Sequence, residues 1–333
     1  MSRTALPVVI AGFFISLLTS GAASACKSVD DAQHIAIAPA VLHDLAKVGI
    51  SRSFIFDALK EVSATETSGC WAGATGNFDA QIVSVGVLQW NYGQGSLQPV
   101  MRRFRDKFPT SAGLSQELTR LMPNHGRLVF SAGCLAAIQT ADCRDGLLAQ
   151  QSGGKLSTTL KQEFDALFES DAMVQVQVDY YVRLLTSVKD DLLRLFKGTT
   201  PTPRQIRWAI DTKVQQGGFP GNADIDRVRK RYGSLSAKEK ITAMLAITTW
   251  YDGLCHTIDQ GGVRLDCDWN VEHWRKTIQA GAVPDEQFDL LQLTFLKSRT
   301  AIGMSGHWQA LTFQRRATIV LGVGSVAGKR VGA

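Results

Sequence analysis

The sequence predicts a mainly α-helical protein with one small β-hairpin. Apolar residues recur at three- and four-residue spacing along most of the 333-residue chain, for example at Val174, Val178 and Tyr181, as in amphipathic helices. A glycine-rich, aromatic segment, residues 66–99, interrupts this pattern, and its run 82–90 predicts a hairpin strand. Hydrophobic residues make up 45% of the chain and charged residues 20%, which excludes a disordered protein.

The first 25 residues have the pattern of a secretory signal peptide. Arg3 supplies a positive start, residues 5–18 an apolar run, and residues 23–25 a cleavage site of small side chains. We therefore expect a mature chain that starts at Cys26 and is secreted or periplasmic. The alternative is a lipoprotein anchored through Cys26, because such signals also end just before a cysteine. No later apolar run has the length of a membrane span, so we expect no stable membrane insertion.

The six cysteines predict disulfide bonds, because an exported chain meets an oxidising compartment. The most economical of the possible pairings joins Cys134 with Cys143, Cys255 with Cys267 and, by remainder, Cys26 with Cys70. Lipidation of Cys26 would leave Cys70 without a partner, which favours simple secretion. Because the sequence has no closely spaced Cys-x-x-Cys or His-x-x-x-His pair, we expect no metal and no cofactor.

The remaining helices follow from periodicity and end signals. Before the glycine-rich segment we expect helices over 39–47 and from Ser51 or Ser53 to Glu66. After it, the pattern predicts helices at 96–108, 111–122, 126–134 and 144–151, and two long ones within 156–197 that meet near Ser170. The length allows one large domain, but Gly153-Gly154 is the most visible break. We interpret it as a hinge between two helical lobes, 26–152 and 153–333.

Two later segments resemble each other, since both place acids on or near a helix before Gln-Gly-Gly. They are residues 209–218, with Asp211 and Gln215, and residues 251–262, with Tyr251 and Asp252. Glycine after a helix is an ordinary stop signal. The alternative is that these helix ends form the far wall of a cleft, with Asp211, Gln215, Tyr251 and Asp252 reaching a substrate. Residues 315–328 contain no phosphate-loop lysine and are interpreted as a docked tail.

Glu66 and Asp79 are the two carboxylates of the glycine-rich segment, and they suit glycoside hydrolysis. Such a reaction needs one protonated acid that donates its proton to the leaving oxygen. It also needs one ionised acid that activates a water molecule or stabilises the positive charge on the sugar. The competing interpretation is a solvated Glu at a helix end and an Asp that closes a turn. Aromatic faces and amides that could contact sugar rings and hydroxyls follow in the same segment: Gln89, Trp90, Asn91 and Tyr92.

The order Glu66, Asp79, Gly86 and Gln89 resembles the lysozyme superfamily, in particular goose-type lysozymes, soluble lytic transglycosylases and chitosanases. The resemblance implies a lysozyme-like helical fold, with Glu66 as the general acid that closes a helix and Asp79 as the second carboxylate. It also implies that Gly86 and Gln89 belong to the hairpin that lines the cleft. The extension at residues 90–97 departs from the usual hairpin and leaves subfamily and bond specificity open.

We therefore expect a secreted hydrolase or lytic transglycosylase that acts on the glycan strands of peptidoglycan. The net charge of +6 suits this anionic substrate better than polycationic chitosan, and we find no basic stripe interleaved with aromatics that would indicate nucleic acid. The alternatives are a chitosanase- or chitinase-type hydrolase and an inactive glycan-binding module of the same fold. An immunity or inhibitor protein would be a further partner if the enzyme is a toxin delivered to rival cells.

Overall fold

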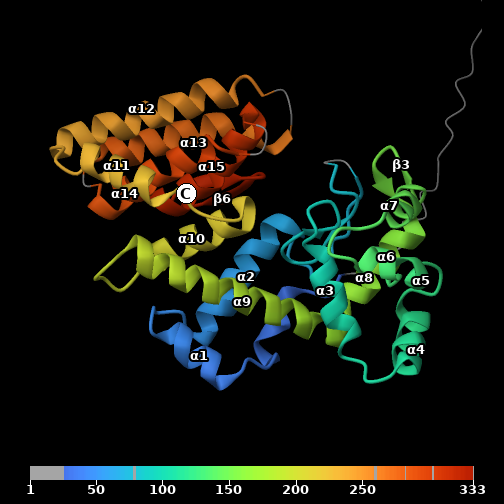
Figure 1. Cartoon of the computed structure of the whole chain (residues 1–333). Coiled ribbons are helices and arrows are strands. Elements are labelled where there is room, and N and C mark those ends of the chain that lie inside the picture. The colour runs from blue at the N-terminus through green and yellow to red at the C-terminus, as the bar shows by residue number, and fades with distance from the viewer. Residues whose placement is uncertain (1–25, 78–79, 259–260, 282, 302–303, 333) are drawn as a thin grey trace, which may run out of the picture.

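The chain is mainly helical, as predicted (Figure 1). The computed structural model describes residues 26–77, 80–258, 261–281, 283–301 and 304–332. The predicted signal peptide and the candidate acid Asp79 lie outside these residues. Within them, no helix is both long enough and apolar enough to cross a membrane.

From residue 39 to residue 197 the described helices begin and end close to the predicted positions, except that the predicted helix 126–134 is divided into two. The described helices of the whole chain follow in order. They are η1 (Val29–His34), α1 (Pro39–Ala46), α2 (Arg52–Glu66), α3 (Leu97–Arg105), α4 (Ser111–Leu121), α5 (Gly126–Val129), α6 (Ala132–Leu135), α7 (Ala141–Leu148), α8 (Thr158–Glu169), α9 (Asp171–Leu195), α10 (Pro203–Gln216), α11 (Asn222–Tyr232), α12 (Ala237–Cys255), α13 (Gly261–Gln279), α14 (Asp285–Ser298) and α15 (Gly306–Leu321). Ser51 begins α2 by accepting a hydrogen bond from the backbone N–H of Phe54, and Ser170 begins α9 in the same way.

Helix α9 is the element that connects the two sides of the molecule. It contacts α1, α3 and α8 on one side and α10 on the other (Figure 1). Its apolar positions, among them Val178, Tyr181 and Leu185, are buried, which confirms the predicted core periodicity. Helix α9 therefore fixes α10 relative to the N-terminal helices.

Helices α10 to α15 and one hairpin form a C-terminal group (Figure 1). Helix α15 lies inside this group and contacts α10, α12, α13, α14 and strand β5. Its residues are buried around the full circumference from Ala310 to Leu321, including the side chains of Arg315 and Arg316. The predicted docked tail is therefore wrong, because these residues form a central helix and a hairpin.

Three short antiparallel hairpins complete the described structure. They are β1 (Ser84–Val85) with β2 (Trp90–Asn91), β3 (Gln151–Ser152) with β4 (Lys155–Leu156), and β5 (Gly324–Val326) with β6 (Lys329–Val331). The first lies in the glycine-rich segment, but the predicted strand 82–90 is divided there into two short strands joined by residues 86–89. The predicted hinge, Gly153-Gly154, is the turn of the second hairpin, and both glycines have positive φ. Because α8 and α9 follow this turn and contact α4 and α3, both sides of the turn contribute to one packed group.

The three predicted disulfides are present: Cys26–Cys70, Cys134–Cys143 and Cys255–Cys267. The first ties the start of the described chain to the residues just after α2. It also occupies the sulfur of Cys26 that a lipid anchor would need. Together the three bonds are compatible with secretion.

Only one of the two Gln-Gly-Gly segments ends a helix. Helix α10 stops at Gly217, which has the left-handed φ of 68° expected of a C-terminal glycine. The second prediction is wrong, because α12 already ends at Cys255 and Gly261 begins α13. A glycine pair alone does not distinguish the end of one helix from the start of the next.

Three buried tyrosines predict how stability changes at alkaline pH. Burial raises the pKa of Tyr92, Tyr181 and Tyr251 above their usual value near 10. An unfolded chain therefore loses these protons first, so the free energy of unfolding should fall as pH rises above 10. In a titration that follows tyrosinate absorbance and helical circular dichroism together, these three should ionise only as helix is lost. Ionisation of all five tyrosines with the helices intact would contradict this burial.

Candidate active site

Glu66 is held at the end of a helix that is anchored in the core. Ile55, Leu59 and Val62 bury one face of α2, and the carbonyl oxygen of Ser63 accepts hydrogen bonds from the backbone N–H groups of Thr67 and Gly69. These contacts fix the point at which the helix ends. The Glu66 side chain is 15% exposed, so it is neither a solvated surface group nor sealed from water.

Two side chains of the C-terminal group bind the Glu66 carboxylate through one oxygen. Gln215 Nε2 donates to Oε1 at 2.9 Å, and Arg315 Nη1 donates to the same oxygen at 2.8 Å. Among the described residues, none donates a hydrogen bond to Oε2. The two oxygens of the Glu66 carboxylate therefore have different surroundings.

Asp211 is the second acid of this cluster, and it binds two arginines. Its Oδ2 accepts from Arg315 Nε at 2.9 Å, and its Oδ1 accepts from Arg316 Nε at 3.2 Å. The side chains of Asp211 and Arg315 are 8% and 9% exposed, and that of Arg316 is fully buried. The four groups Glu66, Asp211, Arg315 and Arg316, called here the charge network, balance two negative charges against two positive ones.

The pKa values of the two arginines differ because they have different neighbours. Burial disfavours the Arg315 cation, but Asp211 and Glu66 outweigh this effect and raise its pKa. Burial lowers the pKa of Arg316 to about 10, since Asp211 compensates only in part and Arg315 repels it. Both side chains are therefore cations at neutral pH. Lys297 lies in the same surroundings, and burial together with the charge of Arg316 lowers its pKa.

The network allows Glu66 to change its charge without isolating a buried ion. If Glu66 takes up a proton, Arg315 keeps the carboxylate of Asp211 as a partner. Without Asp211, the same step would leave Arg315 as an unpaired buried cation, which costs several kcal/mol. Asp211 thus keeps Arg315 paired whatever the charge on Glu66.

The glycine-rich segment after Glu66 is fastened to α8 and α9. Gly86 has a φ of 84°, and a Cβ at this position would lie 2.8 Å from the ring of Phe168. The next residue, Val87, donates its backbone N–H to Gln177 Oε1, and Ala74 donates to Asp165 Oδ1. Gly86 is therefore required by close packing rather than by a substrate.

Asp79 lies outside the described residues, but the chain on either side of it is anchored. Gln151 accepts a hydrogen bond from the backbone N–H of Asn77 and donates one to the carbonyl oxygen of Ile82. Asn77 Oδ1 in turn accepts from the backbone N–H of Ile82. These bonds hold the base of the loop that carries Asp79, and its role as second carboxylate stays a prediction.

The aromatic residues predicted to contact sugar are buried. Tyr92 is fully buried, and its hydroxyl donates to the carbonyl oxygen of Val129. Trp90 is 8% exposed and packs edge-on against Tyr180. Both are core residues, because Trp90 packs against α9 and Tyr92 reaches the backbone of α5. The prediction that they form a sugar platform is wrong in this structure.

The neighbouring amides bind their own segment. Gln89 Nε2 donates to the carbonyl oxygens of Gly73 and Gly86, and Asn91 Oδ1 accepts from the backbone N–H of Gln94. Both side chains are partly exposed, but these bonds give each a structural role.

The second Gln-Gly-Gly segment does not reach the charge network. Tyr251 is fully buried, stacks on Phe313 and donates its hydroxyl to Gln314. Asp252 pairs with Arg275 and His256. Of the predicted cleft-wall residues, the structure therefore brings Gln215 to Glu66 directly and Asp211 through Arg315.

Sequence reasoning missed Arg315 and Arg316. A signal was present, because the two arginines interrupt the apolar helical positions Phe313, Ala317 and Val320. Charged residues are almost never fully buried unless they are paired. Two arginines inside such a run therefore indicate buried acidic partners elsewhere in the chain.

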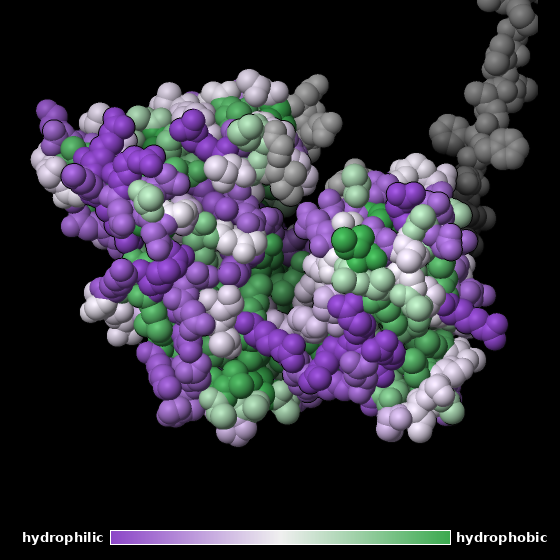
Figure 2. Space-filling view, viewed as in Figure 1, coloured by the Kyte–Doolittle hydropathy of each residue, from purple (hydrophilic) through white to green (hydrophobic). Residues whose placement is uncertain are grey.

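The surface of the molecule has a hollow, and a cavity lies next to the charge network. Figure 2 shows it hollowed between the C-terminal group and the side of the molecule that carries α3 to α8. A cavity of about 740 Å³ lies between α2, α10, α15 and β6, and its lining is mostly apolar but includes Asp211 and Arg315. Asp211 and Arg315 of the charge network thus line this cavity, whereas Glu66 is not among its lining residues.

Asp211→Asn should strongly destabilise the protein. The substitution leaves two buried guanidinium groups with one remaining carboxylate, and breaking a buried ion pair costs about 3–5 kcal/mol. The matched control is Glu272→Gln, which breaks an exposed pair with Lys276 and should leave the free energy of unfolding nearly unchanged, because exposed ion pairs contribute little. Urea unfolding measures both. Equal, small losses in the two variants would show that the network does not stabilise the fold.

Comparison with known proteins identifies no relative of the chain. No protein-family model, no curated protein and no solved structure matches the chain. Its function is therefore argued from the residues of the site.

Proposed function

We propose that the protein cleaves the glycan strands of peptidoglycan, with Glu66 as the proton donor. The observation that carries this proposal is the asymmetric binding of the Glu66 carboxylate. Oε1 is fixed by Gln215 and Arg315, while Oε2 accepts no hydrogen bond from the described residues. A partly exposed carboxyl group with one fixed and one available oxygen suits proton transfer to a bound glycosidic oxygen.

In the proposed mechanism, Glu66 binds substrate in its protonated form and donates the proton from Oε2 as the glycosidic bond breaks. The carboxylate that results is stabilised at once by Arg315 and Gln215, which already point at Oε1. Asp79 either directs a water molecule to the opposite face of the sugar or steadies the positive charge on the ring. In the second case the substrate's own hydroxyl closes an anhydro ring.

The fold and charge support this substrate class. A mainly helical chain whose acid closes a helix before a small hairpin resembles the lysozyme superfamily. The net charge of +6 favours an anionic wall polymer over polycationic chitosan. The three disulfides suit the exported location in which that polymer is found.

One observation favours a second candidate, a glycan-binding module that does not cleave. An arginine that donates to a carboxylate favours the ionised form of that carboxylate. An ionised Glu66 would accept hydrogen bonds from sugar hydroxyls instead of donating a proton. The two candidates therefore differ in whether Glu66 ever carries a proton when glycan is bound.

Glu66→Gln should reduce cleavage by on the order of 10²- to 10⁴-fold, the usual contribution of a general acid. The amide keeps an oxygen for Arg315 and Gln215 but cannot act as an acid. Cleavage is measured by incubating residues 26–333 with peptidoglycan sacculi and identifying the released fragments by mass spectrometry. Anhydro ends indicate transglycosylation, and reducing ends indicate hydrolysis.

Glu61→Gln is the matched control, because it removes the same charge from an exposed position of the same helix. It should leave cleavage unchanged. Full activity in Glu66→Gln would exclude Glu66 as the acid. If the wild-type protein binds sacculi but releases nothing, the binding module is the better assignment.

A further inference from the structure

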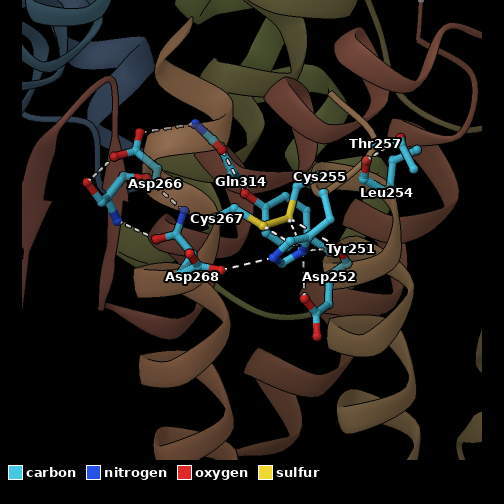
Figure 3. The surroundings of a disulfide bond; sticks show 12 residues. Tyr251, Asp252, Leu254, Cys255, Thr257, Asp266, Cys267, Asp268 and Gln314 are labelled. Carbon is cyan, nitrogen blue, oxygen red and sulfur yellow. Dashed lines mark hydrogen bonds and ion pairs between the residues drawn. A yellow bond between two sulfur atoms is a disulfide. The ribbon is translucent and has the colours of Figure 1, made fainter. Parts of the chain in front are cut away.

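Four potential metal ligands meet where α12 ends beside α13, away from the charge network. They are Asp252, Cys255 and His256 from α12 and the residue after it, and Cys267 from α13. One ligand atom from each lies within 4.8 Å of the others. Figure 3 shows Asp252 and Asp268 on either side of the Cys255–Cys267 disulfide. The sequence prediction of no metal considered only close Cys and His pairs, whereas these ligands come from two helices.

We propose that Cys255, Cys267, His256 and Asp252 bind a zinc ion when the Cys255–Cys267 disulfide is reduced. A dithiol reductant supplies two electrons and two protons, which convert the disulfide into two thiols while the dithiol closes into its own disulfide. Zinc then replaces the two thiol protons and forms two zinc–thiolate bonds. The disulfide and the zinc ion are therefore alternative links between the same two cysteines, which are 12 positions apart in the sequence.

The backbone already permits this exchange. Tetrahedral zinc with bonds of about 2.3 Å to sulfur needs the two sulfurs roughly 3.8 Å apart. The Cα atoms of Cys255 and Cys267 are 6.0 Å apart, so side-chain rotation alone can separate the sulfurs to that extent.

His256 and Asp252 are placed as the third and fourth ligands. His256 Nδ1 lies 3.4 Å from Cys267 Sγ and 3.8 Å from Cys255 Sγ. Asp252 Oδ1 lies 3.0 Å from the same nitrogen. These spacings are close to the edges of a zinc tetrahedron, about 3.3–3.8 Å for the bond lengths that zinc takes. Metal binding would replace the present 2.7 Å contact of Nδ1 with the backbone oxygen of Asp252.

The outer partners of a zinc site are also present. Asp268 Oδ1 lies 3.0 Å from His256 Nε2, the nitrogen that would not bind the metal. Arg275 Nη2 donates to Asp252 Oδ2 at 2.8 Å, which leaves Oδ1 for the ion. Carboxylates that orient metal-binding histidines in this way are typical of zinc sites. Both cysteines are buried, whereas the His256 side chain is 40% exposed and offers an entry path.

Cobalt(II) and zinc titrations of the reduced full chain test the proposal. The protein is reduced with dithiothreitol, desalted under nitrogen and titrated with cobalt(II), followed by zinc. We expect one metal ion per chain, with the visible bands of tetrahedral cobalt and a thiolate charge-transfer band, and displacement of cobalt by zinc. The oxidised chain should bind neither ion.

Variants distinguish metal binding at this site from metal binding by the other reduced cysteines. Cys255→Ser with Cys267→Ser, or His256→Ala alone, should abolish the cobalt bands, and Asp268→Asn should weaken binding by about 10- to 100-fold. The matched control, Cys134→Ser with Cys143→Ser, removes a pair of similar spacing and should bind normally. Cobalt bands that survive in the first two variants would overturn the proposal, as would a reduced, folded chain that binds no metal.

Circular dichroism covers the case in which reduction unfolds the chain. Zinc should then restore the helical signal in the control variant but not in the variant that lacks Cys255 and Cys267, because metal binding is coupled to folding. Failure of zinc to restore helix in the control variant would also overturn the proposal.

Discussion

The ion pairs that Asp211 forms with Arg315 and Arg316 are the interaction on which the rest of the site depends. Two adjacent arginines can be buried inside a helix only if acids meet them there. Asp211 of α10 meets both, and Glu66 of α2 meets one. The network therefore fixes α2, α10 and α15 relative to one another. It also determines where the carboxylate of Glu66 lies.

This arrangement differs from the apolar pocket in which many general acids are kept protonated. Trp71, an aromatic residue that closely follows Glu66 in the chain, is buried in the core. The partners of Glu66 are instead an arginine and an amide. Under the proposed function, Arg315 stays paired with Asp211 when Glu66 is protonated. The position of the Glu66 carboxylate therefore depends on the packing of α15, which carries Arg315.

The mainly helical class and the positions of several elements were predictable because they depend on local patterns. Apolar periodicity located α9, serine caps located the starts of α2 and α9, and the cysteine pairing was correct. Glu66 was found because it ends a helix before an unusual segment. The prediction that Tyr92 and Trp90 contact sugar was wrong, since an aromatic side chain that is close in sequence to a candidate acid packs into the core as readily as it faces a cleft. The sequence alone does not indicate which face of a two-residue strand is buried.

The site was predictable only where one segment contains the signal. Gln215 and Asp211 were found from the helix before Gly217, but Arg315 and Arg316, the partners of Asp211, lie about a hundred residues later in the chain. Pairing over that distance is a property of tertiary packing, which a single sequence does not display. The same reason hid the cluster of Asp252, His256 and the two cysteines, whose members are ordinary residues on two separate helices.

A crystal structure of Glu66→Gln soaked with an oligosaccharide of the glycan strand would test the central claim most directly. The account predicts a glycosidic oxygen within hydrogen-bonding distance of the side chain at position 66, with Arg315 still bound to Asp211. A sugar chain in the 740 Å³ cavity between α2, α10 and α15, with its glycosidic oxygens away from residue 66, would contradict the account. In that case the charge network would be only a structural support.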